Sequence, residues 1–183
     1  MDVLSHGLWG AIVFGRKRRR DFWLAFLFGM FPDLFSFGLY FFSLFFGLSG
    51  HPTFASSDHP ADLVPDYVHY LYSWTHSLII FSLIFALLWI LFRKPVIASL
   101  AWPLHIVFDI FTHSDKYFPT PFLWPLSGFH INGIQWSTPI IFIPNVILLV
   151  AVYFWFFKMH HKHPHIFPYH VEGKKVSQRD SKR

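Results

Sequence analysis

The chain has 183 residues, of which 54% are hydrophobic and only 14% are charged. Soluble domains carry roughly 25% charged residues, and a soluble fold of this size has too small an interior to bury so much apolar surface. The composition therefore argues against a disordered protein and against an ordinary soluble domain. Because the chain contains no cysteine, disulfides, thiolate metal sites and a cysteine nucleophile are also excluded.

Five apolar segments follow one another along the chain. The first, residues 3–14, is too short to cross a bilayer and predicts a short N-terminal helix. A membrane-spanning helix needs about 20 apolar residues, and four later segments approach or exceed that length. They are residues 22–48, 70–92, 95–112 and 139–157. We therefore expect an all-α fold, a polytopic transmembrane helical bundle with about four spans plus the short N-terminal helix.

The basic residues are unevenly placed along the sequence. They gather at residues 16–20, at Arg93 and Lys94, and after residue 157, whereas the loops at 49–69 and 114–137 contain a single lysine. Since basic loops face the cytoplasm, the two poorly basic loops are predicted to face outward and the C-terminus to be cytoplasmic.

We divide the chain into two parts. Residues 1–157 form one integral-membrane helical domain, and residues 158–183 form a basic, histidine-rich cytoplasmic tail that we expect to be disordered and to contact anionic lipid. No nucleic-acid partner is expected, because no nucleic-acid-binding module accompanies the charge.

A few ionisable residues lie within the apolar segments, where an acid costs roughly 2.5–3.5 kcal/mol on insertion scales. No lysine or arginine lies within these segments to pair with the two acids. A buried carboxylate without a cationic partner must be protonated, accept hydrogen bonds from neutral donors, or bind a metal. These candidate site residues are His6, Asp33, His76, His105, Asp109 and His113.

The spacing in the third long segment is informative. His105, Asp109 and His113 follow one another at intervals of four, which places them on one side of a helix, about 6 Å apart along its axis. Neighbouring members can share one metal ion, and the whole stripe could extend over two. Imidazole with carboxylate suits zinc, manganese or iron. The alternative is a polar stripe satisfied by serine, threonine and water.

Depth along the predicted spans gives a second indication. Counted at 1.5 Å per residue from the predicted helix ends, the ionisable residues all fall in the outer half of the bilayer. This placement predicts one polar cavity that opens toward the outside.

Several short motifs occur in order on successive helices and together resemble a known family. The sequence is similar to the YdjM-type inner-membrane metal-dependent hydrolases, which are related to zinc-dependent phospholipase C and P1 nuclease. The motifs are Ser5-His6-Gly7, Pro32-Asp33, Thr75-His76-Ser77 and His105-x3-Asp109 running on to Thr112-His113.

The resemblance implies a helical metal site, a hydrolytic activity and a bacterial inner membrane. It implies His6, Asp33, His76, His105 and Asp109 as metal ligands, with His113 as an addition and zinc as the favoured ion. The chain departs from the family pattern at Leu71-Tyr72, where members often carry a His-Arg pair, and at Phe35, where many carry a second acid.

These observations lead to one main functional hypothesis. We expect a metal-dependent hydrolase that acts at the outer face on a phosphoester, in a small molecule or a lipid or lipid-linked headgroup, with Asp33 and His113 as catalytic candidates. There is no HExxH motif, no GxSxG elbow and no P-loop. Two alternatives remain: a non-catalytic protein that binds or transports a divalent cation, and a metal-free structural bundle.

Overall fold

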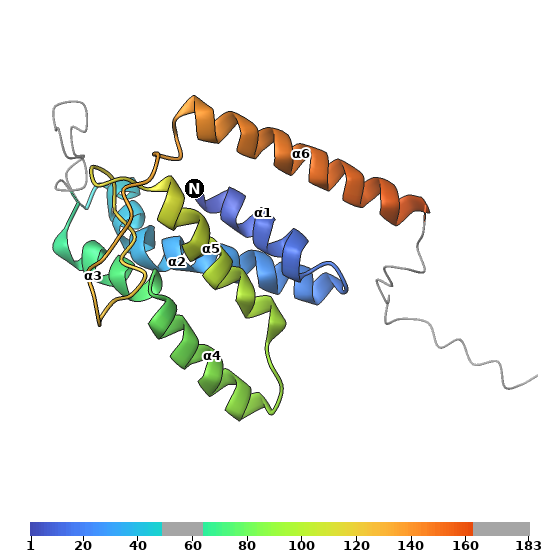
Figure 1. Cartoon of the computed structure of the whole chain (residues 1–183), viewed down its shortest axis with the longest axis horizontal. Coiled ribbons are helices and arrows are strands. Elements are labelled where there is room, and N and C mark those ends of the chain that lie inside the picture. Colours follow the sequence, from blue (N-terminus) through green and yellow to red (C-terminus); the bar gives the residue numbers. More distant parts are fainter. Residues whose placement is uncertain (49–63, 163–183) are drawn as a thin grey trace, which may run out of the picture.

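The computed structural model describes residues 1–48 and 64–162, with side chains up to residue 159. The described part is all-helical, and its only β pairing is an isolated bridge between Ser114 and Tyr117. This confirms the expected all-α fold class. The elements, labelled in Figure 1, are α1 (Val3–Phe14), α2 (Arg19–Phe45), α3 (Asp66–Thr75), α4 (Leu78–Phe92), the 3-10 turn η3 (Ile97–Leu100), α5 (Ala101–Thr112) and α6 (Pro139–Lys162).

Two helices are long and apolar enough to cross a membrane: α2, and α6 over Pro139–Met159. A third span is possible if α3 and α4, which meet at a bend of 57°, count as one broken span. The expected span at 95–112 is instead the shorter apolar helix Ile97–Thr112. The length and composition of these helices are consistent with a membrane protein, but the expected count of four spans is not confirmed.

The boundary expected at residue 157 is also crossed by regular structure. Helix α6 continues to Lys162, so the first five residues of the predicted tail are helical. The rest of that tail, 163–183, and most of the first predicted outer loop, 49–63, lie outside the described residues.

Polar caps explain where two of the helices begin. The carboxylate of Asp2 accepts a hydrogen bond from the Ser5 amide at 2.9 Å and so caps α1. The hydroxyl of Ser77 accepts hydrogen bonds from the amides of Ile79 and Ile80 and caps α4. This second cap divides the apolar run at 70–92 into two helices, and His76 lies at the break.

Small residues allow α1 to cross α2 at very short range. A Cβ atom on Gly29 of α2 would lie 2.5 Å from the carbonyl oxygen of His6, and one on Gly10 of α1 would lie 2.7 Å from the Cβ of Ala101. Close helix contact through small residues is typical of membrane bundles. It brings α1 against both α2 and the start of α5.

Apolar side chains join the other helices to this centre. Trp102 and Ile106 of α5 pack with Phe81 of α4, and Tyr72 of α3 packs with Tyr40 of α2. The outer faces of α2, α4 and α6 remain apolar and exposed, as expected for surfaces in contact with lipid. Figure 1 shows α4 leading away from the central group of α1, α2 and α5, whereas α6 runs along the outside of that group beside α1.

Helix α6 is attached to α1 by polar contacts within its apolar length. The Asn145 side chain accepts a hydrogen bond from Trp9 Nε1 at 2.9 Å and donates one to the Ser5 hydroxyl at 2.8 Å. About two helical turns further along α6, the Tyr153 hydroxyl donates a hydrogen bond to the carbonyl of Leu8 at 2.9 Å.

Candidate metal centre

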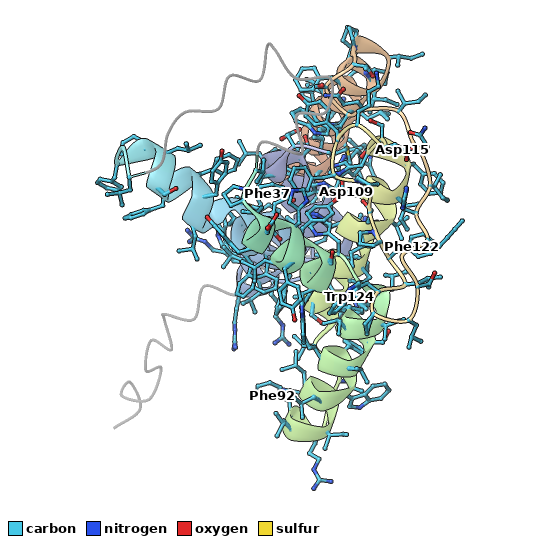
Figure 2. All side chains as sticks on the ribbon, turned by 90° about the vertical axis from the view of Figure 1, so that its left-hand side faces the viewer. Phe37, Phe92, Asp109, Asp115, Phe122 and Trp124 are labelled. Carbon is cyan, nitrogen blue, oxygen red and sulfur yellow. The ribbon has the colours of Figure 1, made fainter. Side chains whose placement is uncertain are left out.

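Four ionisable side chains from three parts of the chain meet in the interior. Asp33 comes from α2, His76 from the break between α3 and α4, and His105 and Asp109 from successive turns of α5. One ligand atom from each lies within 4.8 Å of all the others, and all four residues are buried. Figure 2 shows Asp109 among the helices, whereas Asp115 lies at their margin. These four residues form a group able to hold a metal ion.

The separations between the ligand atoms fit a single ion. Nε2 of His76 lies 3.5 Å from Oδ1 of Asp33 and 3.4 Å from Oδ2 of Asp109. Nε2 of His105 lies 3.7 Å and 3.0 Å from the same two oxygens, and the two Nε2 atoms are 3.0 Å apart. Ligands at about 2.0–2.1 Å from a tetrahedral zinc ion lie about 3.3 Å from one another.

The hydrogen bonds of the two imidazoles explain why these nitrogens need a cation. Nδ1 of His76 lies 3.0 Å from the carbonyl oxygen of Tyr72, and Nδ1 of His105 lies 2.7 Å from that of Gly29. A carbonyl only accepts, so in each neutral ring the single proton is on Nδ1 and Nε2 carries a lone pair. Two lone pairs then face each other and two carboxylates. Either a metal ion or an extra proton on one ring must lie between them.

Asp109 supplies further support for a metal. Its Oδ2 atom is buried and has no hydrogen-bond partner among the described residues, although Nε2 of His105 is only 3.0 Å away. A buried carboxylate oxygen without a donor is costly, and a metal ion at this point would satisfy it. Among the described residues, Asp33 and Asp109 form no ion pair with lysine or arginine, but the amino group of Met1 supplies Asp109 with a cationic partner that the sequence did not indicate.

The other predicted ligands gather around Oδ1 of Asp109. Nε2 of His6 lies 2.9 Å from this atom and Nε2 of His113 lies 3.5 Å from it. The amino group of Met1 also contacts Oδ1 and donates to Thr112 Oγ1 at 3.1 Å. The structure thus brings His6 and His113 to the site, on the carboxylate oxygen that faces away from His76 and His105. Their role as ligands stays a prediction.

The segment after α5 folds back over the end of that helix. The amide of Gly133 donates to the carbonyl of His113 at 2.8 Å, and the amide of Ile134 donates to that of Phe111 at 3.0 Å. Around the site, small exposed fractions remain on the side chains of His113, Asp33 and Met1, 11%, 8% and 7% respectively.

Sequence reasoning missed the residues that hold the ligands in place. Tyr72 stacks on the His76 ring, with centroids 3.6 Å apart, and His6 stacks on the His105 ring at the same distance. The sequence marked Tyr72 only as a departure from the family pattern, and the Gly29 carbonyl carries no side-chain signal. The serine that caps α4 could have been found, because Ser77 directly precedes a long apolar run.

Comparisons with known proteins add no relative. No protein-family model matches the chain, and no match was found among the curated proteins or the solved structures. The geometry of the four-residue group is therefore the main evidence for what this chain does.

Proposed function

We propose that this chain is a membrane-embedded metal-dependent hydrolase. The observation that supports the proposal is the buried group of Asp33, His76, His105 and Asp109, whose ligand atoms converge at the spacing of a tetrahedral site. Two imidazole nitrogens with two carboxylate oxygens suit zinc best, with manganese and iron as alternatives. A divalent ion bound there would lower the pKa of a bound water and polarise a substrate oxygen.

The protein's own residues have separate tasks in this proposal. Among the four residues of the group, only Asp33 keeps a measurable side-chain exposure, 8%, and its oxygen makes the two longest contacts with the histidines, 3.5 and 3.7 Å. It is therefore the ligand best placed to make room for water. His113 is the candidate general base, because its Nδ1 lies 2.8 Å from the carbonyl of Phe118, which leaves Nε2 free to accept a proton.

A phosphoester in a lipid or lipid-linked headgroup is the proposed substrate class. The ligand group lies among apolar helices, and the predicted outer loop 114–137 hydrogen-bonds to the end of α5 at Phe111 and His113. With the C-terminus on the cytoplasmic side of a bacterial inner membrane, the site would face headgroups of the outer leaflet. A small water-soluble phosphoester would be hydrolysed by the same reaction and is the alternative substrate.

One observation favours a second function, a protein that binds a divalent cation without catalysis. The group already offers four protein ligands, and closed tetrahedral sites of this kind are typical of structural zinc, whereas catalytic zinc keeps a position open for water. The two functions share the metal and differ in turnover.

Metal content is the first test of the proposal. The full chain, purified in detergent without an affinity histidine tag, is analysed by elemental mass spectrometry after incubation with zinc, manganese or iron. Asp109→Asn and His76→Ala should lose the metal, while Asp115→Asn and His130→Ala, which alter exposed side chains of the outer loop, should retain it. A parent protein that takes up none of the three ions would refute both metal-dependent functions.

Turnover separates the hydrolase from the cation-binding protein. The metal-loaded protein is assayed with chromogenic phosphodiesters and phosphomonoesters and with phospholipids in mixed micelles, beside the metal-free protein and Asp109→Asn. Hydrolysis that requires both the metal and Asp109 supports the hydrolase. Stoichiometric metal without hydrolysis of any of these phosphoesters supports the cation-binding function.

A further inference from the structure

Tyr72 contacts the His76 imidazole in two ways. It lies on α3 one turn before His76 and is only 2% exposed. Its ring stacks on the imidazole, with centroids 3.6 Å apart and an interplanar angle of 19°. Its carbonyl oxygen lies 3.0 Å from Nδ1 of the same imidazole. Oγ1 of Thr75 also lies 3.0 Å from this Nδ1. Tyr72 therefore packs on the ring plane of this predicted ligand and supplies one of the two oxygen atoms beside its Nδ1.

The Tyr72 hydroxyl reaches a second histidine of the site. It lies 2.9 Å from Nδ1 of His113 and 3.0 Å from Oγ1 of Thr120. The carbonyl of Phe118, 2.8 Å from the same Nδ1, accepts only, so Nδ1 of His113 carries a proton. The Tyr72 oxygen then shares that proton as an acceptor, and its own hydroxyl proton goes to Thr120. With these proton positions, Nε2 of His113 carries no proton, and it lies 3.5 Å from Oδ1 of Asp109.

We propose that Tyr72 is a positioning residue of the metal centre, holding His76 through its ring and carbonyl and His113 through its hydroxyl. The proposal rests on the proposed function, because the role of Tyr72 at His76 requires that the site binds a metal, and its role at His113 requires that His113 takes part in turnover. Residues that orient metal ligands from outside typically change affinity or activity 10- to 100-fold when they are replaced.

A purely structural role for Tyr72 makes different predictions. The residue belongs to an apolar cluster with Tyr40, Val68 and Phe118, and a phenylalanine would fill the same space in it. If packing were its only role, removal of the hydroxyl would leave the metal centre and turnover unchanged. The phenol is, however, fully buried and directed at a site histidine and a buried threonine, which packing alone does not require.

The test uses the full chain loaded with Co²⁺, whose visible absorption reports the geometry of its ligands. Tyr72→Phe removes the hydroxyl alone, and Tyr72→Leu also removes the stacked ring while keeping an apolar side chain. Tyr40→Phe is the matched control, since Tyr40 is buried in the same cluster. Thr120→Val and Thr120→Ser test the partner of the hydroxyl, and the serine variant should behave as the parent.

We expect Tyr72→Leu to shift the Co²⁺ spectrum and to weaken Co²⁺ binding by about 10- to 100-fold. Tyr72→Phe and Thr120→Val should lower kcat about 10- to 100-fold with KM and metal content unchanged. A parent-like Co²⁺ spectrum and affinity in Tyr72→Leu would overturn the proposal, and so would a parent-like kcat in Tyr72→Phe. The spectra need no turnover, so a parent that binds Co²⁺ but hydrolyses nothing refutes the hydrolase while the spectra still decide the role of Tyr72. A parent that binds no Co²⁺ overturns both.

Discussion

The backbone of Gly29 lies directly against that of His6, so that a Cβ atom on Gly29 would stand 2.5 Å from the His6 carbonyl oxygen. The carbonyl of Gly29 is also the acceptor, at 2.7 Å, for Nδ1 of His105. One glycine thus sets both the distance between α1 and α2 and the orientation of a predicted ligand.

We predict that Gly29→Ala separates α1 from α2 and weakens metal binding. The three nearest atoms to this Cβ belong to the backbone of His6 and Gly7 and cannot move aside, so the substitution should lower the free energy of unfolding by about 1–3 kcal/mol, as overpacking does. Thermal unfolding in detergent, with and without zinc, measures both effects. Gly38→Ala on the same helix is the control, because a Cβ there meets nothing within 4 Å. Equal unfolding temperatures for the two variants would contradict this account of the crossing.

Binding of the metal should stabilise the fold. A ligand present at 100 times its dissociation constant stabilises the folded state by about 2.7 kcal/mol. Removal of the metal by a chelator should therefore lower the unfolding temperature of the parent but not that of Asp109→Asn. Asp115→Asn, which changes an exposed acid, should respond to the chelator as the parent does. If the chelator shifts Asp109→Asn as much as the parent, Asp109 is not a ligand.

The four-residue group predicts one metal ion per chain. His6 lies outside this group and contacts Oδ1 of Asp109 at 2.9 Å, so His6→Ala should keep the stoichiometry while weakening the affinity about 10- to 100-fold. Titration followed by elemental analysis measures both quantities. Two ions per parent chain, with one lost in His6→Ala, would instead make His6 a ligand of a second ion.

The contact of the loop with the end of α5 depends on Gly133. A Cβ atom on this residue would lie 2.3 Å from the carbonyl oxygen of Phe111, so Gly133→Ala should displace the loop from α5. Faster amide hydrogen exchange and easier proteolysis within residues 114–137 are the expected results. Gly128→Ala lies in the same loop in open space and should leave both rates as in the parent.

The attachment of α6 to α1 should depend on Asn145. Replacement by leucine removes the hydrogen bonds to Trp9 and Ser5, and interhelical hydrogen bonds of this kind contribute about 0.6–2 kcal/mol each in membrane proteins. The unfolding temperature of Asn145→Leu should therefore fall. Ile147→Leu changes an exposed apolar position of the same helix and should leave the temperature unchanged.

Much of the site could be predicted because the helical period is a local property of the sequence. The interval of four between His105 and Asp109 places both side chains on one face of α5, and the structure confirms that they point to the same centre. Polar residues in an apolar segment are also visible without any structure, and Asp33 and His76 were found in this way.

The contacts between helices could not be predicted in the same way. Tyr72 and the carbonyl of Gly29 contact the site histidines only because α3, α2 and α5 pack together. The spacing of residues along the sequence does not predict how these helices pack. The expected count of four spans was not confirmed for a related reason. The run at 95–112 is apolar apart from a few polar residues such as His105 and Asp109, yet residues 97–100 form a 3-10 turn, so the α-helix begins at Ala101 and is short.

The order of the four ligands along the chain has a consequence for biosynthesis. Asp33 leaves the ribosome long before His76, and the last ligand, Asp109, comes only with α5. The centre therefore cannot close until more than half of the polypeptide has been inserted, and α6, which attaches to α1 away from the ligands, arrives after it. Under the proposed function, metal uptake would follow the insertion of α5, and in pulse-labelled chains it would serve as a marker that α2, the break between α3 and α4, and α5 have come together.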